Sequence, residues 1–159
     1  MDQFTRRIIG FGIQAGEVNG VALCRMFNAA VSAKGPPKYL SSDNDPLFQY
    51  HRWRANLRIL EIEEIKSLPY IPLSHPFIER LIGTIRRELF DQVLFWNASD
   101  LERKLADFRQ YYNSHRVHTA LDNTAPSDSA GRSVIRRAEL GNFRWESHCQ
   151  RLYQLPVAA

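Results

Sequence analysis

Two carboxylates, Asp43 and Glu79, have the side chains and the surroundings that metal-dependent chemistry needs. Asp43 follows a short apolar stretch that predicts a buried strand over residues 38–42. Glu79 lies in the first turn of a predicted amphipathic helix that begins near Phe77. Carboxylates brought together from a strand end and a helix start are ligands for Mg²⁺ or Mn²⁺, as a divalent-metal phosphoryl-transfer site requires. The separation of the pair is weak support by itself, because the chain has 17 acidic residues.

The composition is that of one globular domain with a mild preference for polyanions. The chain has 159 residues, 44% of them hydrophobic and 24% charged, which is enough to bury a core without disulfides or metals. Its net charge is +4, and the arginines gather at positions 6–7, 52–58, 80–87 and 132–137. Basic clusters favour nucleic acid through counterion release. A solvated helix face is an equally good interpretation of any single cluster.

Cys24 and Cys149 are the only cysteines, too few for a disulfide framework in a chain of this size. Cys24 falls on an apolar helical pattern, which favours a buried side chain over a thiol nucleophile. We therefore expect a reducing, cytoplasmic location. The sequence shows no signal peptide and no apolar stretch of about 18 residues, so we expect no membrane partner.

Short strands and amphipathic helices alternate along the chain and must position the two acids. The predicted strands cover residues 6–14, 38–42 and 64–68. The predicted helices cover residues 21–33, 45–57, 77–93 and 97–113. Because the first strand, the first helix and the second strand follow one another, we predict a parallel α/β unit.

Local signals mark where several of these elements begin. Asn19 and Asn97 are predicted N-caps, and Ser74 or His75 is predicted to cap the helix that carries Glu79. Residues 2–5 are predicted to form the turn before the first strand. A basic helical segment over residues 134–140 precedes an aromatic tail, which we expect to pack on the core or on a partner. The tryptophans at positions 53, 96 and 145 are predicted to be core residues rather than base-stacking residues.

Four segments, in this order, resemble the catalytic core of DDE integrases and transposases, the core found in bacterial insertion sequences and in retroviral integrases. DQFTRRIIGFGI resembles the hairpin of the second and third strands, and SSDNDPLF resembles the element SDNGPEF. SHPFIERLIGTIRREL resembles the element with the final Glu, and YYNSHRVHTALDNTAPSD resembles the signature YN-x-x-R-x-H-x-x-L-x-x-x-T-P. Together these segments cover residues 2–128.

The resemblance implies an α/β, ribonuclease-H-like fold with a mixed sheet flanked by helices, and cleavage and joining of DNA strands with Mg²⁺ or Mn²⁺. Asp43 then corresponds to the second and Glu79 to the third catalytic acid, and both would bind metal. Their separation by 35 residues suits the family. We accordingly assign residues 1–128 to the core and 129–159 to a C-terminal tail of unknown role. The implied partners are DNA and either a second copy of the chain or a transposase subunit.

The sequence departs from the family pattern at two places. Asp45 stands where the family has Gly, and this third carboxylate either adjusts metal affinity or caps the following helix; we favour the cap. The first catalytic acid and its strand have no counterpart, since Asp2 matches the hairpin aspartate instead. We therefore expect a core that lacks its first strand and is incomplete at the N-terminus.

The second departure leaves two functions open. The chain is either an integrase/transposase core that cleaves and transfers DNA strands by two-metal phosphoryl transfer, or an inactive truncated remnant that at most binds DNA or a transposase subunit. A ribonuclease-H-like nuclease for RNA would also use carboxylates, but the signature after the third acid argues against it. By resemblance the chain is a polynucleotidyl transferase; whether it is an enzyme by itself stays open.

Basic side chains near Glu79 are candidates for DNA contact. The resemblance assigns this role first to Arg86, two turns further along the same helix face, and then to Arg80 and Arg87. Asn44 either touches DNA or holds its loop, and the loop role is favoured.

Polar residues of the signature have less specific interpretations. Asn113 has either a structural or a DNA-facing role. His115 and His118 have the spacing H-x-x-H, but no Cys pair or third ligand stands nearby, so we expect no zinc site.

Overall fold

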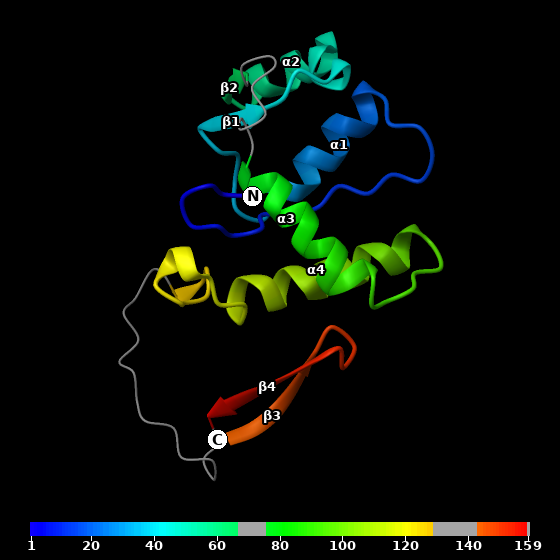
Figure 1. The fold of residues 1–159 in the computed structure, drawn as a ribbon. Coiled ribbons are helices and arrows are strands. Elements are labelled where there is room, and N and C mark those ends of the chain that lie inside the picture. The colour runs from blue at the N-terminus through cyan, green and yellow to red at the C-terminus, as the bar shows by residue number, and fades with distance from the viewer. Residues whose placement is uncertain (67–75, 129–142, 159) are drawn as a thin grey trace. The chain divides into compact units, whose positions relative to one another are not determined.

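The computed structural model describes residues 1–66, 76–128 and 143–158, and Figure 1 traces the order of their elements. The chain forms two compact units. The first unit contains Met1–Ile8 and Leu89–Ala159, and the second unit contains Ile9–Glu88. No helix in the described ranges is long and apolar enough to cross a membrane.

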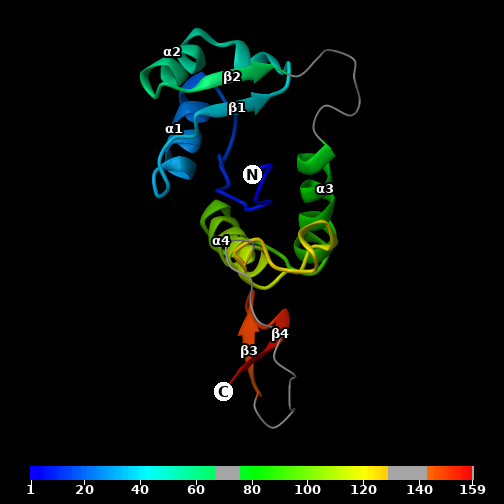
Figure 2. The same cartoon turned by 90° about the vertical axis from the view of Figure 1, so that its left-hand side faces the viewer.

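The second unit is built on two parallel strands, β1 (Tyr39–Ser42) and β2 (Glu63–Lys66). The 3₁₀-helix η1 (Pro46–Gln49) and the helix α2 (His51–Ile59) connect them. Figure 2 shows the two strands side by side and pointing the same way. A parallel α/β unit is therefore present, although β1, α2 and β2 form it rather than residues 6–42.

Trp53 is the centre of the core of the second unit. Its side chain is 1% exposed and packs with Leu57 and Ile62. The ring of Phe27 meets the indole edge-on at 5.1 Å between centroids, and the ring of Phe48 lies 5.5 Å away. The core position predicted for Trp53 is confirmed, and the arginines of α2 are exposed.

Asparagine caps begin two helices, as predicted. The side chain of Asn19 accepts two backbone N–H bonds of 3.0 Å at the start of α1 (Gly20–Val31). The side chain of Asn97 accepts one of 2.9 Å at the start of α4 (Ala98–Ser114). Each cap satisfies N–H groups that have no partner within the helix itself, so the helix starts were readable from local sequence.

The strand predicted over residues 6–14 is wrong. This segment has no regular secondary structure and pairs with neither sheet of the described chain. An apolar, β-branched segment becomes a strand only when another strand supplies its backbone hydrogen bonds. Gly10 and Gly12 are instead needed for close packing. A Cβ on Gly10 would lie 2.8 Å from Ala30, and a Cβ on Gly12 would lie 2.7 Å from Met26. The glycines therefore let this segment lie directly against α1.

The turn predicted at residues 2–5 is confirmed, and Asp2 forms it. Its carboxylate accepts hydrogen bonds from the backbone of Phe4 at 2.9 Å and from the hydroxyl of Thr5 at 2.6 Å. These bonds, together with that from the N–H of Thr5, outweigh partial burial and lower the pKa of Asp2. The Asp2 carboxylate therefore accepts its hydrogen bonds from residues of its own turn.

The helix that carries Glu79 is shorter than the predicted span of residues 77–93. Helix α3 covers Pro76–Ile85, and the chain then changes to a π-helix, η2 (Arg86–Phe90), which ends the regular α-helical ladder. Leu81 and Leu89 are buried, as expected for an amphipathic helix. The caps predicted at positions 74 and 75 lie outside the described residues.

Helix α4 forms the core of the first unit and holds the N-terminal segment. Leu105, Phe108 and Tyr112 are buried along one face, as the periodicity predicts. At the end of the helix, the Asn113 carboxamide accepts from the N–H of Ile8 at 2.8 Å and donates to its carbonyl at 3.0 Å. Asn113 therefore pairs with one residue of a distant segment as a neighbouring strand would, which is a structural role. The short 3₁₀-helix η3 (Thr119–Leu121) follows.

The C-terminal residues form an antiparallel hairpin of β3 (Phe143–His148) and β4 (Tyr153–Ala158). The ring of Tyr153 stacks on that of Tyr111 in α4, with centroids 4.1 Å apart and planes 1° from parallel. The expected packing of the tail on a core is confirmed by this contact. The helical segment predicted over residues 134–140 lies outside the described residues.

Two tryptophans are not core residues, and that prediction is wrong for both. Trp96 is 84% exposed and precedes α4, while Trp145 is 66% exposed on β3. A two-stranded hairpin cannot cover both of its faces, so a large side chain on the outer face stays in solvent.

Candidate functional site

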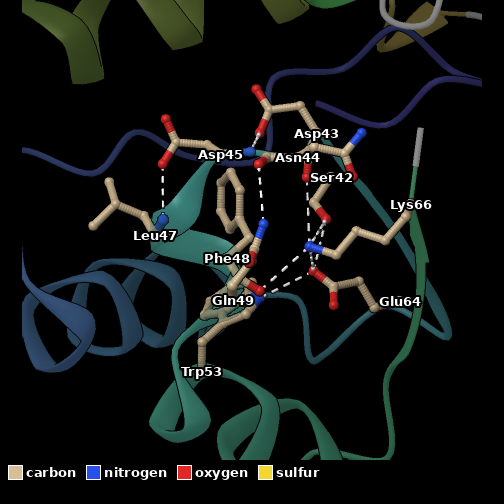
Figure 3. A network of polar contacts seen from close by, with 10 residues as sticks. All are labelled: Ser42, Asp43, Asn44, Asp45, Leu47, Phe48, Gln49, Trp53, Glu64 and Lys66. Carbon is tan, nitrogen blue, oxygen red and sulfur yellow. Dashed lines mark hydrogen bonds and ion pairs between the residues drawn. The ribbon is translucent and has the colours of Figure 1, made fainter. Parts of the chain in front are cut away.

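Asp43 directly follows the carboxyl end of the parallel strand β1, the edge at which α/β sheets place their functional groups. The side chain is exposed, and its Oδ1 accepts the backbone N–H of Asp45 at 3.0 Å. Asp45 in turn accepts the N–H of Leu47 at 2.8 Å and begins η1 (Figure 3). The capping role predicted for Asp45 is confirmed. The two turns give the loop a defined shape and leave the outer oxygen of Asp43 toward solvent.

Glu79 lies in the first turn of α3, as predicted, and is exposed. Both acids belong to the second unit, one at a strand end and one at a helix start. Residues 67–75, which connect β2 to α3, lie outside the described residues. Within the described ranges no three His, Cys, Asp or Glu side chains are close enough to share a metal ion. A metal site formed by Asp43 and Glu79 therefore stays a prediction.

The chemistry of these two donors fits a hard divalent cation. Mg²⁺ and Mn²⁺ are bound by carboxylate oxygens and keep several water ligands, so exposed carboxylates suit them better than buried ones. One carboxylate oxygen of Asp43 accepts a hydrogen bond from its own loop, and the side chains of both acids are exposed. The thiols do not fit such an ion, and burial raises the pKa of Cys149 to about 11.

A polar network below the Asp43 loop was not anticipated from the sequence. Glu64 Oε1 accepts from the hydroxyl of Ser42 at 2.6 Å and from the indole of Trp53 at 3.1 Å, and it pairs with Lys66 at 2.9 Å. Partial burial alone would raise the pKa of Glu64, but these hydrogen bonds and the Lys66 charge outweigh it and lower the pKa. The E-x-K alternation in β2 was the available signal, since it puts both charges on one face of a strand.

The residues predicted to contact DNA are all exposed. Arg80 lies on α3, Arg86 begins η2, and the Arg87 guanidinium lies back along the helix, 3.2 Å from where a Cβ on Gly83 would be. The backbone carbonyl of Asn44 accepts from the Gln49 amide at 3.3 Å, and the role of the Asn44 side chain stays a prediction. Contact of these four residues with DNA stays a prediction.

His115 faces a histidine of the C-terminal hairpin. Its ring lies 4.2 Å from that of His148 in β3, measured between centroids. Desolvation, and then the His148 charge, lower the pKa of His115 from its ordinary value of 6.5, although Glu146 and Asp128 act in the opposite direction. The packed hairpin therefore favours a neutral His115.

This histidine pair should make the first unit sensitive to acid. Because the folded pKa of His115 is below 6.5, its contribution to stability is complete above that pH and is lost as the pH falls through the folded value. We expect the thermal midpoint of the chain to fall between pH 7 and about pH 5.5, with less of a fall in His115→Gln. Melting curves followed by circular dichroism measure this, with the exposed His51→Gln as control. If the thermal midpoint fell equally with pH in His115→Gln and in the unaltered chain, this prediction would be contradicted.

Comparisons with known proteins find integrase and transposase cores among similar sequences, and integrase cores among similar structures. Residues 60–126 match the family model described as integrase core domain. The chain is 27% identical over 138 residues to an insertion element IS476 protein of 39.2 kDa from Xanthomonas euvesicatoria, covering 87% of this chain and 40% of that protein. It is 24% identical to the transposase for insertion sequence element IS904 of Lactococcus lactis, covering 80% of this chain and 51% of that protein. The chain thus spans about half the length of the curated relatives it matches.

A solved structure supports the fold. The structure of the HTLV-2 integrase catalytic core domain in complex with magnesium superposes with a TM-score of 0.54 at 17% identity, covering 70% of this chain and 68% of that chain. This likeness supports the ribonuclease-H-like fold. The matched core domain, the insertion-element relatives and this fold all make the chain similar to DDE integrase/transposase cores.

Proposed function

We propose that the chain acts on DNA as the core of an insertion-element transposase or integrase, cleaving and joining strands with Mg²⁺ or Mn²⁺. The observation that supports this most directly is the place of Asp43, at the carboxyl end of a parallel strand in a chain whose residues 60–126 match the integrase core domain. A second copy of the chain or another transposase subunit is the proposed protein partner. The two free cysteines agree with a reducing cytoplasm.

The residues of the chain have separate tasks in this proposal. Asp43 and Glu79 supply the carboxylate oxygens that hold the metal ion. When bound, a divalent ion activates an attacking hydroxyl and neutralises charge on the phosphate during in-line displacement. The exposed Arg80, Arg86 and Arg87 follow Glu79 on α3 and η2, where their positive charges attract the DNA backbone.

Removing either acid should abolish metal-dependent nicking. We expect Asp43→Asn and Glu79→Gln to reduce Mn²⁺-dependent nicking of supercoiled DNA at least about 100-fold, since metal-bound charge stabilisation amounts to several kcal/mol. Glu102→Gln, an exposed acid on α4, is the matched control and should keep full activity. DNA binding, followed by fluorescence anisotropy, should persist in all three variants.

Two results would overturn the proposal. Nicking that survives in both acid variants would place the active carboxylates elsewhere. An unaltered chain that binds DNA but never nicks it would favour the inactive-remnant alternative.

A further inference from the structure

The Lys66 ammonium bridges the two ends of the loop that carries Asp43. Its Nζ donates to the backbone carbonyl of Asp43 at 3.4 Å and to that of Phe48 at 3.3 Å, on either side of the Asp45 cap. The hydroxyl of Ser42, the last residue of β1, accepts a third bond at 3.0 Å. The ammonium also lies 5.4 Å from the centre of the Phe48 ring. One cation therefore ties together the strand end, the acid and the following 3₁₀-helix, as Figure 3 shows.

Glu64 fixes the ammonium in this position. It stands on the same face of β2 as Lys66 and pairs with it at 2.9 Å. The Glu64 carboxylate is itself held by Ser42 and by the buried indole of Trp53. The two side chains are 15% and 32% exposed, so the pair is more protected from solvent than an ordinary surface ion pair. The position of Lys66 is thus set by the core of the second unit.

We infer that Lys66 is a positioning residue for the catalytic metal site, acting on Asp43 through its backbone carbonyl. Asp43 follows the last, buried residue of a four-residue strand and precedes exposed loop residues, so the pairing of the strands does not extend to it. The bonds to its carbonyl and to that of Phe48 close the loop and hold the carboxylate in one orientation before an ion arrives. Preorganised ligands bind a metal more tightly than mobile ones. The inference rests on the proposed role of Asp43 as a metal ligand.

For the removal of the Lys66 charge, simple electrostatics predicts the opposite change in metal affinity, which makes the inference testable. A positive ammonium near a cation site repels the cation, so its removal should tighten metal binding if only its charge mattered. Removal of the neighbouring Glu64 charge should weaken binding on the same reasoning. If Lys66 holds the loop and Glu64 holds Lys66, loss of either group should weaken binding.

The experiment compares Lys66→Met, Lys66→Arg and Glu64→Gln in the full chain. Lys34→Met and Glu63→Gln are matched controls, because they remove the same charges from exposed positions of the same unit. Amide hydrogen exchange of residues 43–49 without metal reports loop order, and Mn²⁺ titration followed by electron paramagnetic resonance reports affinity.

In Lys66→Met we expect exchange in residues 43–49 to rise about tenfold, with α1 unchanged, and Mn²⁺ affinity to fall severalfold. Lys66→Arg keeps the positive charge, so its exchange rate in residues 43–49 and its Mn²⁺ affinity should lie between those of Lys66→Met and the unaltered chain. Glu64→Gln should raise the exchange of residues 43–49 and lower the Mn²⁺ affinity, as Lys66→Met does. If Lys66→Met does not fold, the exchange measured in Glu64→Gln still tests the inference. Tighter Mn²⁺ binding in Lys66→Met, or unchanged exchange in residues 43–49, would overturn the inference. An unaltered chain that binds no Mn²⁺ would instead overturn the proposed metal site, while the exchange measurement still decides whether Lys66 holds the loop.

Discussion

Trp53→Ala should lower the free energy of unfolding of the second unit by about 3–5 kcal/mol, the largest effect we expect from any single change. The indole is 1% exposed and touches rings from α1 and from η1, so its removal leaves a cavity between three elements. Its N–H also donates to Glu64 at 3.1 Å, and the loss of this bond leaves a half-buried carboxylate with one donor fewer. Chemical denaturation followed by far-UV circular dichroism measures the change.

The control for this variant is Trp96→Ala, because Trp96 is 84% exposed and its removal should change stability by no more than about 0.5 kcal/mol. Trp53→Phe separates packing from hydrogen bonding, since it restores most of the volume and none of the N–H. Similar losses for Trp53→Ala and Trp96→Ala would contradict the assignment of Trp53 to the core.

Asn113→Ala should release the N-terminal segment and lower stability by about 2–3 kcal/mol. The estimate combines two hydrogen bonds of about 1 kcal/mol each with the penalty for leaving buried backbone groups without partners. Ile8, which makes both bonds, is 2% exposed, so water cannot readily replace the carboxamide. Denaturant titration gives the stability, and limited proteolysis at the arginines of positions 6 and 7 reports release of the segment.

Two variants sharpen this second test. Asn113→Asp keeps the acceptor for the Ile8 N–H but loses the donor to its carbonyl, so it should release the segment as well. Gln110→Ala removes an exposed amide from the same helix and should have little effect. If Gln110→Ala and Asn113→Ala gave equal proteolysis rates, the pairing of Asn113 with Ile8 would carry no stability.

Features set by a few neighbouring residues were predictable from sequence. The caps at Asn19, Asp45 and Asn97 each use an N–H group within the next few residues, so the local sequence contains both partners. The burial of Trp53 followed from helical periodicity. The positions of Asp43 and Glu79 at a strand end and a helix start followed from the same signals.

Features that depend on distant partners were missed. The segment of residues 6–14 has a strand-like composition, but its partners are an asparagine of α4 and the small residues of α1, which no local pattern shows. The C-terminal hairpin could not be predicted from its turn. Cys149, Gln150 and Arg151 adopt positive φ there. The Asn-Gly or Asp-Gly pair that usually marks a hairpin turn is absent from these residues. The Lys66 network needs Ser42 to pair with Lys66 across the sheet, which only the register provides.

The bond between Ile8 and Asn113 also has a consequence for the order in which the chain folds during synthesis. The two residues are 105 positions apart, so at about 5–20 residues per second the ribosome needs roughly 5–20 seconds to deliver the second after the first. The second unit is one continuous stretch, Ile9–Glu88, and its contacts can form while the rest is still being made. The first unit must wait for α4. Translation order thus favours early assembly of the Asp43 loop, and the N-terminal residues can dock only after α4 has been made.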